Sequence, residues 1–156
     1  MKISYVVPVY NEEKGFEKFF KELLMPEIKK TKKDYEIILV NDGSKDKSLE
    51  IIQGLAEADK NVKVVSLSRN FGKEVSLTAG IREATGDAVI TMDADGQQPP
   101  ALIHEFIKKW QKEDADIVVG VRGKYEKHGF IDSGYVDEDM PDSLNMICYL
   151  SEKDPW

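Results

Sequence analysis

The sequence predicts an α/β protein in which a mostly parallel β-sheet carries helices on both faces. In the first 122 residues, short runs rich in Val and Ile alternate with longer runs whose apolar residues recur at helical spacing. The strand-like runs are rich in Val and Ile and do not alternate strictly between apolar and polar residues, as expected for strands covered on both faces. Repeated strand–helix units of this length favour parallel strands joined by helical crossovers.

Five runs are predicted to be strands. They cover residues 3–9, 35–41, 62–67, 88–92 and 116–121. Between the first two, a helix is predicted from residue 13 to about residue 30, because its large apolar side chains fall on one helical face. Those side chains are Phe16, Phe19, Phe20, Leu23 and Leu24. All five are expected in the core.

Three further helices are predicted between the later strands. The second helix has an apolar stripe formed by Leu49, Ile52, Leu55 and Ala56. The third spans about residues 72–84. The fourth has an apolar stripe formed by Leu102, Ile103, Phe106, Ile107 and Trp110. Helix starts are also marked: Asn11 is a predicted N-cap before two glutamates, and Ser44 or Asp46 is a predicted cap for the second helix. Pro99 and Pro100 fit the opening of the fourth helix.

Composition narrows the class of protein. The net charge of −7 argues against nucleic acid as a partner. Residues 123–156 hold eight acidic and three basic residues, a net of −5, which leaves only −2 for the first 122. The single cysteine, Cys148, excludes an internal disulfide and suits the cytoplasm, and no run approaches the roughly 20 apolar residues of a membrane span.

Polar residues follow each predicted strand directly. In open parallel sheets, ligands bind beyond the carboxyl ends of the strands, so these residues are expected to share one rim. The rim would consist of residues 10–12, 41–44, 68–73, 93–97 and Arg122. Each group alone fits a turn or a helix cap, but their repetition at successive strand ends favours a binding site.

The fourth strand ends in the most informative of these groups. Asp93 and Asp95 are separated by one residue, so on extended chain their carboxylates point the same way, and Gln97 can join them if the turn allows. Oxygen ligands of this kind suit Mg²⁺ or Mn²⁺, which usually bridges to phosphate oxygens of a substrate. A solvated turn is the alternative interpretation of the same residues.

These residues together resemble the inverting glycosyltransferases of family 2, which have the GT-A fold. The resemblance rests on VVPVYNEE at 6–13, VNDGSKDKS at 40–48, SLSRNFGKEVSLTAGI at 66–81 and MDADGQQPP at 92–100. The RNFGK run and the DAD-x-Q-x-PP form, which contains a DXD motif, are most similar to the polyprenyl-phosphate branch. The resemblance therefore implies a metal-dependent transferase of cell-envelope glycan synthesis, with a UDP- or GDP-sugar as donor and a polyprenyl phosphate as acceptor.

The resemblance also implies a role for each matching residue. Pro8, Tyr10, Asn11 and Glu12 would line the nucleotide pocket, and Asp42 would accept a hydrogen bond from the base. Asp93 would lie near the ribose and diphosphate, and would hold the metal with Asp95 and Gln97. Arg69 and Lys73 would lie near the diphosphate or an anionic acceptor, with Arg122 as a further candidate. Cations and a metal at these places would stabilise the charge of the departing diphosphate.

The nature of the acceptor decides whether a general base is needed. A phosphate monoester is already anionic near neutral pH, whereas a hydroxyl acceptor requires a carboxylate to remove its proton. The sequence offers no secure candidate for such a base, and for the acidic cluster 137–139 a solvated loop is favoured over a base.

The chain is expected to divide into a nucleotide-sugar-binding domain, residues 1–122, and an acidic segment, residues 123–156. In this segment only residues 144–150 are apolar enough to pack, so a short added element, a mobile flap and a disordered tail all stay open. It lacks the amphipathic membrane-surface helices expected of the polyprenyl-phosphate branch, which suggests a truncated acceptor region. Peripheral association with the inner face of a membrane, or with a membrane partner, remains an expectation of the resemblance alone.

Two other classes of protein fit part of the pattern. A nucleotide-sugar-binding module without turnover would keep the donor site and lack the acceptor region. A flavodoxin-like receiver or dinucleotide-binding domain would share the fold class. However, no G-x-G-x-x-G follows the first strand, which argues against a dinucleotide-binding domain, and a receiver would leave Asp93, Asp95 and Gln97 unexplained.

Overall fold

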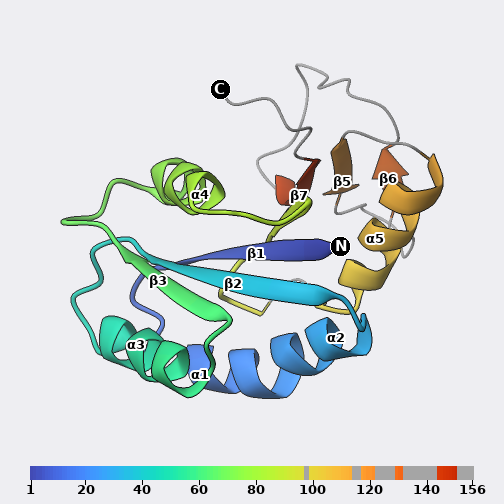
Figure 1. Ribbon diagram of the computed structural model, residues 1–156. Helices are drawn as coiled ribbons and strands as arrows, with labels where there is room; N and C mark the ends of the chain where they lie inside the picture. The colour runs from blue at the N-terminus through green and yellow to red at the C-terminus, as the bar shows by residue number, and fades with distance from the viewer. Residues whose placement is uncertain (97–98, 114–116, 122–128, 132–143, 151–156) are drawn as a thin grey trace.

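A mixed seven-stranded sheet forms the centre of the computed structural model (Figure 1). The structure describes residues 1–96, 99–113, 117–121, 129–131 and 144–150. The strands are β1 (Lys2–Val9), β2 (Asp34–Asn41), β3 (Val62–Ser66), β4 (Ala88–Thr91), β5 (Ile117–Val121), β6 (Gly129–Ile131) and β7 (Leu144–Leu150). Their order across the sheet is β3-β2-β1-β4-β7-β5-β6.

The first four strands run parallel, as predicted. β1 pairs with β2 and with β4, and β2 pairs with β3, all in parallel register. The order β3-β2-β1-β4 means that the chain winds outward from β1 in one direction and then returns to place β4 on the other side of it. This reversal makes the carboxyl ends of β1 and β4 a topological switch point, the usual ligand site in such sheets.

The strand β7 is the main addition to the predicted topology. It lies between β4 and β5 and pairs antiparallel with both. Residues 144–150 belong to the segment 123–156, for which the sequence leaves three alternatives open; apart from β6 and β7 this segment lies outside the described residues, so its interpretation stays a prediction. β5 keeps the direction of the first four strands but is separated from β4 by β7, and β6 adds an antiparallel edge beyond it.

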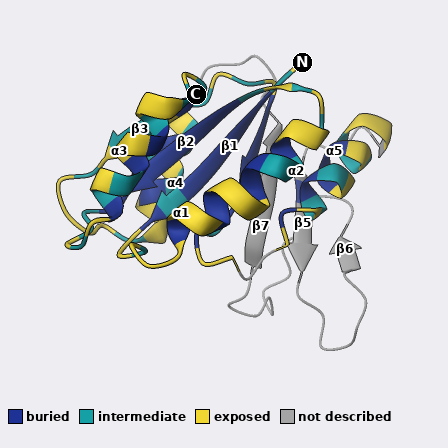
Figure 2. Cartoon of the chain, turned by 90° about the horizontal axis from the view of Figure 1, so that it is seen from below, coloured by how far each residue is buried: buried dark blue, intermediate teal, exposed yellow. Residues whose placement is uncertain are grey.

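Helices cover both faces of the sheet, also as predicted (Figures 1 and 2). The helical segment after β1 comprises α1 (Phe16–Lys18), a π-helix η1 (Phe19–Leu24) and α2 (Met25–Lys30). The later helices are α3 (Ser48–Ala58), α4 (Lys73–Arg82) and α5 (Leu102–Glu113). The larger core cluster takes its helical residues from α1, η1, α2, α3 and α5, whereas α4 covers the opposite face.

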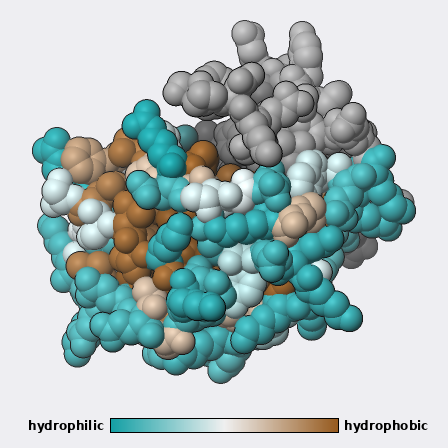
Figure 3. Space-filling view, viewed as in Figure 1, coloured by the Kyte–Doolittle hydropathy of each residue, from teal (hydrophilic) through white to brown (hydrophobic). Residues whose placement is uncertain are grey.

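Strand periodicity explains how two cores arise from continuous apolar runs. On β1, Tyr5 and Val7 belong to the larger cluster and Val6 to the smaller, because successive side chains point to opposite faces. On β2, Leu39 and Val40 divide in the same way. Among the described residues, α4 is the helix that packs on the face of the smaller cluster. In Figure 3, hydrophobic surface gathers at the left, over the edge strand β3 between α4 and α3.

One predicted core residue is wrong. Leu23 is 49% exposed, whereas Phe16, Phe19, Phe20 and Leu24 are buried. The predicted stripe assumes α-helical spacing, but residues 19–24 form a π-helix. The wider π turn rotates later side chains relative to the α-helical phase, so Leu23 leaves the core face while Leu24 stays on it.

Two helix glycines give a matched test of how closely α4 packs. A Cβ on Gly80 would lie 2.4 Å from Cγ1 of Val6 and 2.9 Å from Cγ2 of Val40, whereas a Cβ on Gly54 in α3 meets nothing within 4 Å. Gly54→Ala is expected to stabilise the protein by up to about 1 kcal/mol through helix propensity. Gly80→Ala is expected to lower the free energy of unfolding by about 1 kcal/mol, because overpacking outweighs the same propensity gain. Urea denaturation of both variants checks the contrast, and equal stabilisation would contradict the packing described for α4.

Candidate active site at the carboxyl edge of the sheet

A cavity of about 320 Å³ lies at the carboxyl ends of β1, β2 and β4. Its lining residues come from the ends of β1, β2 and β4 and from the loop between β3 and α4. They are Pro8, Val9, Tyr10, Glu12, Asp42, Asn70, Gly72, Lys73, Asp93, Ala94 and Asp95. The structure therefore brings together seven predicted site residues, and it adds Asn70 and Gly72, which sequence reasoning placed on the rim without a role.

The loop after β1 is fastened to the segment that opens α3. The backbone N–H of Asn11 donates to Oγ of Ser44 at 3.1 Å, and its side-chain Oδ1 accepts from the backbone N–H of Lys45 at 2.9 Å. Asn11 has a left-handed φ of 53°. It does not cap the first helix, which begins at Phe16 after Gly15, so that prediction is wrong. Its amide joins two loops and does not line the cavity.

Glu12 lies on the cavity wall with its backbone held in place. Its N–H donates to Oγ of Ser48 at 2.7 Å. Burial, followed by the negative charges of Asp95 and Asp46, raises the pKa of the Glu12 carboxyl above its usual value. The site thus concentrates acidic groups, and this arrangement favours a cation beside them.

Asp42 anchors the loop that leads into α4. The side chain is only 4% exposed, and its two oxygens accept from the backbone N–H groups of Phe71, at 2.8 Å, and Gly72, at 3.0 Å. Gly72 precedes α4 with a φ of +96°, in the region that favours glycine. A role for Asp42 in binding a base stays a prediction, but its position as a loop anchor is a feature that the sequence did not reveal.

Replacing Asp42 with Asn tests this anchor. Each N–H group contacts a different carboxylate oxygen, so in Asn one of the two N–H groups would face the new NH₂, which is also a donor. Amide hydrogen exchange at Phe71 and Gly72 is expected to speed up by about tenfold, in keeping with loss of a charge-assisted hydrogen bond. The amide of Met92, which donates to the carbonyl of Val6 in the sheet, serves as the internal control. Unchanged exchange at Phe71 and Gly72 would rule the anchor out.

Lys73 and Asp93 form an ion pair across the cavity. Nζ of Lys73 lies 2.6 Å from Oδ1 of Asp93, and the two side chains are 44% and 17% exposed. Lys73 is the first residue of α4, whereas Asp93 follows β4, so the pair connects the two sides of the site. Asp95 lines the same cavity, as expected from its spacing to Asp93.

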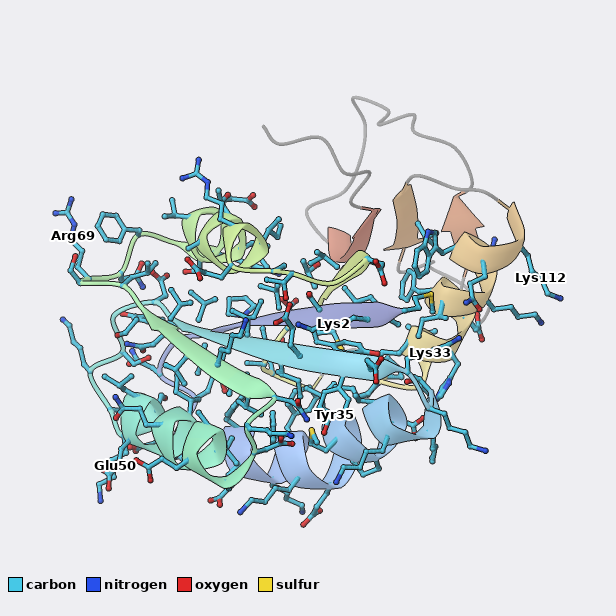
Figure 4. The ribbon with its side chains drawn as sticks, in the orientation of Figure 1. Lys2, Lys33, Tyr35, Glu50, Arg69 and Lys112 are labelled. Atoms are coloured by element: carbon cyan, nitrogen blue, oxygen red, sulfur yellow. The ribbon has the colours of Figure 1, made fainter. Side chains whose placement is uncertain are left out.

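Arg69, like Asn11, stands apart from this group, and two further predicted residues are not described by the structure. Arg69 lies at the outer tip of the loop before α4 (Figure 4), where its guanidinium stacks over the ring of Phe71 at 4.7 Å, and it is not among the residues that line the cavity. Gln97 and Arg122 lie outside the described residues, so their predicted contacts stay predictions.

The side chains that line the cavity fit a divalent cation shared with a ligand. Asp93, Asp95 and Glu12 supply carboxylate oxygens, and Lys73 supplies the positive charge beside them. No group of three His, Cys, Asp or Glu in the described part of the chain has the arrangement of a closed metal site. Two carboxylates with further ligands from phosphate oxygens are the usual setting for Mg²⁺, so the donor set agrees with a shared site and not with an all-protein cage.

Comparison with known proteins identifies the family. The family model described as glycosyl transferase family 2 matches residues 4–147. The chain belongs to this family, and its fold is the GT-A fold. The match extends to Ile147, so it includes most of β7.

The relatives are bacterial and phage glycosyltransferases. An uncharacterized glycosyltransferase of Synechocystis, sll0501, is 50% identical over 78% of this chain and 38% of its own length. A prophage bactoprenol glucosyl transferase homolog of Escherichia coli K12 is 46% identical over 83% of this chain and 42% of its own. The chain thus spans less than half the length of the curated relatives that it matches.

Solved structures of glycosyltransferases have the same fold. The mannosyltransferase PcManGT of Pyrobaculum calidifontis, in complex with GDP-Man and Mn²⁺, aligns with a TM-score of 0.62 at 24% identity. That alignment covers 78% of this chain and 35% of the mannosyltransferase. TarS of S. aureus in complex with UDP-GlcNAc aligns with a TM-score of 0.59 at 25% identity, over 82% of this chain and 37% of TarS.

Proposed function

We propose that this chain is the donor-binding part of an inverting glycosyltransferase that uses a UDP- or GDP-sugar and a divalent cation. One observation carries the proposal: Asp93 and Asp95 share a cavity with Glu12 and Lys73 at the switch point between β1 and β4. A nucleoside diphosphate brings negative phosphates, which need a cation beside carboxylates of this kind. When bound, Mg²⁺ or Mn²⁺ would stabilise the charge of the leaving diphosphate.

Different residues of the cavity are proposed to bind different parts of the donor. Pro8 and Tyr10 form the wall at the end of β1, where a base or ribose would rest, and Asp42 holds the loop that bounds the pocket. Asp93 and Asp95, with Gln97, would hold the cation. Lys73 would contact the diphosphate, where a fixed positive charge favours departure of the leaving group. Arg69 and Arg122 are proposed to contact the diphosphate or an anionic acceptor.

The proposed acceptor is a polyprenyl phosphate. Relatives named bactoprenol glucosyl transferase support this class, and so do the RNFGK and DAD-x-Q-x-PP runs. A phosphate acceptor attacks as an anion, so transfer to it does not depend on a carboxylate base. None of the helices in the described part of the chain is both long and apolar enough to cross a bilayer. We propose that the lipid phosphate approaches the cavity from a membrane surface.

A second candidate function is donor binding without turnover. The residues that line the cavity are all proposed to contact the donor or its cation, so the cavity by itself supports donor binding. Both functions require the same donor site, so they differ only in product formation.

Calorimetric titration of UDP-, GDP- and TDP-sugars, with and without Mn²⁺, tests the donor site. Binding of one sugar nucleotide that strengthens at least tenfold with Mn²⁺ is the expected result. Equal binding with and without the cation would reject the metal-dependent site. Incubation of the preferred donor with Mn²⁺ and polyprenyl phosphate then separates the two functions, since glycolipid product supports the transferase and tight donor binding without product supports the module.

A further inference from the structure

In the ion pair between Lys73 and Asp93, the lysine ammonium contacts the carboxylate that the proposed function assigns to a divalent metal ion. Asp93 is a proposed metal ligand, yet in the structure its Oδ1 already lies 2.6 Å from the ammonium of Lys73. The backbone beside Lys73 is held by a hydrogen bond. Lys73 is the first residue of α4, and the Gly72 N–H before it donates to the buried carboxylate of Asp42 at 3.0 Å. The flexible side chain of Lys73 can still change its partner.

The two proposed partners of Asp93 are in electrostatic conflict. A divalent cation on this carboxylate would stand within a few ångströms of the Lys73 ammonium, and like charges at such a distance repel strongly in a partly desolvated site. The conflict disappears if the ammonium has another anion to contact. The diphosphate of a donor supplies that anion in the same cavity, because Lys73, Asp93 and Asp95 all line it.

We propose that Lys73 acts as an internal counter-ion, which neutralises Asp93 in the donor-free protein and exchanges onto the donor's diphosphate when cation and donor bind. This inference rests on the proposed function, and it adds that binding of the cation depends on binding of the nucleotide. The cation alone binds weakly, because Lys73 competes for Asp93. The nucleotide removes that competition, so cation and nucleotide strengthen each other's binding beyond their direct contact.

Lys73 is therefore a residue that sets the coupling between two ligands. A substitution that removes the charge of Lys73 and keeps its apolar stem should change the affinities for Mn²⁺ and for the nucleotide in opposite directions. Lys73→Met is expected to tighten Mn²⁺ binding in the absence of nucleotide by about threefold to fivefold, the size of a partly exposed ion pair. The same variant is expected to weaken UDP or GDP binding at saturating Mn²⁺ by about tenfold, because one charged contact to phosphate is lost.

Two further variants separate the ion pair from a general charge effect. Lys60→Met removes the same charge from an exposed position that does not line the cavity, and both affinities are expected to stay within about twofold. In an Asp93→Asn background, Lys73→Met is expected to lose its effect on Mn²⁺ binding, since the direct partner is gone. If Lys73 acted only through its long-range electrostatic field, Lys73→Met would still change Mn²⁺ binding in the Asp93→Asn background.

Calorimetry and Mn²⁺ electron paramagnetic resonance measure these affinities without any turnover. Opposite shifts in Lys73→Met that are absent in Lys60→Met, together with loss of the Mn²⁺ effect in the Asp93→Asn background, would establish the exchange. Unchanged or weaker Mn²⁺ binding in Lys73→Met, while the wild type binds Mn²⁺ and nucleotide cooperatively, would overturn the exchange and leave the proposed function intact. A wild type that binds neither UDP nor GDP in the presence of Mn²⁺ would overturn both.

Discussion

Asp95→Asn is expected to weaken Mn²⁺-dependent binding of the sugar nucleotide by about 100-fold or more, with little change in the stability of the fold. Asp95 lines the cavity on an exposed turn after β4 and belongs to neither core cluster. Asn keeps the shape of the side chain and removes the charge that a divalent cation requires. Calorimetry with donor and Mn²⁺ gives the binding constant, and thermal unfolding gives the stability.

A charge-matched control makes this result specific. Glu50→Gln removes one negative charge from the exposed first turn of α3, outside the cavity, and Figure 4 shows Glu50 at the edge of the molecule. Its donor affinity should equal that of the wild type. A parallel fall of donor affinity and melting temperature in Asp95→Asn would instead indicate that Asp95 supports the structure and not the ligand.

Glu36→Gln is the second change with a large expected effect, and it acts on stability. Glu36 is 2% exposed on β2, at the opposite end of the strands from the cavity. Its Oε2 accepts from Nζ of Lys2 at 2.9 Å and Nζ of Lys63 at 2.8 Å. Its Oε1 accepts from Oγ of Ser4 at 2.6 Å, and from N–H and Oγ1 of Thr85 at 2.6 and 2.9 Å.

A glutamine cannot satisfy these donors. Its single oxygen can face one group of donors, while its NH₂ must face the other. The free energy of unfolding is expected to fall by about 2–3 kcal/mol, less than for a fully buried ion pair because both lysines reach water. The melting temperature would fall by roughly 5–10 °C. Asp34→Asn, an exposed change on the same strand, is expected to have almost no effect.

The same carboxylate gives a pH dependence of known sign. Burial alone would raise the pKa of Glu36, but the hydrogen bonds from Lys63, Ser4, Lys2 and Thr85 outweigh it and lower the pKa well below the ordinary 4.5. A lowered pKa stabilises the folded state above the ordinary value, and this stabilisation is lost as the pH falls below it. The stability difference between wild type and Glu36→Gln should therefore be full at pH 7 and shrink below about pH 4. A difference that grows in acid would contradict this assignment.

The sequence predicted the parallel half of the fold well, for a physical reason. Continuous Val and Ile runs such as residues 35–41 admit few alternatives when helical stripes flank them, and β2 begins one residue from the predicted start. Asp93 and Asp95 also line one cavity, as their position directly after the fourth strand predicted, although Asp95 lies in a turn and not on extended chain. Both features depend on local patterns, and local patterns are what a single sequence displays.

Features that depend on long-range contacts escaped prediction. The insertion of β7 between β4 and β5 follows from pairing across more than twenty residues, which no local pattern reveals. The π-helix that exposes Leu23 changes the helical phase without any Pro or Gly within it to mark the change. Asp42, Glu36 and Lys73 owe their roles to partners distant in sequence, namely Gly72, Lys2 and Asp93.

The most direct test of the account is the position of Mn²⁺ in a crystal of the protein grown with UDP or GDP, located by its anomalous scattering. The account predicts a single strong manganese peak in the cavity between β1 and β4, bound by carboxylate oxygens of Asp95 and Asp93 and by the diphosphate. Nucleotide bound in the cavity with no manganese beside these two residues, or manganese and nucleotide bound elsewhere on the molecule, would contradict it.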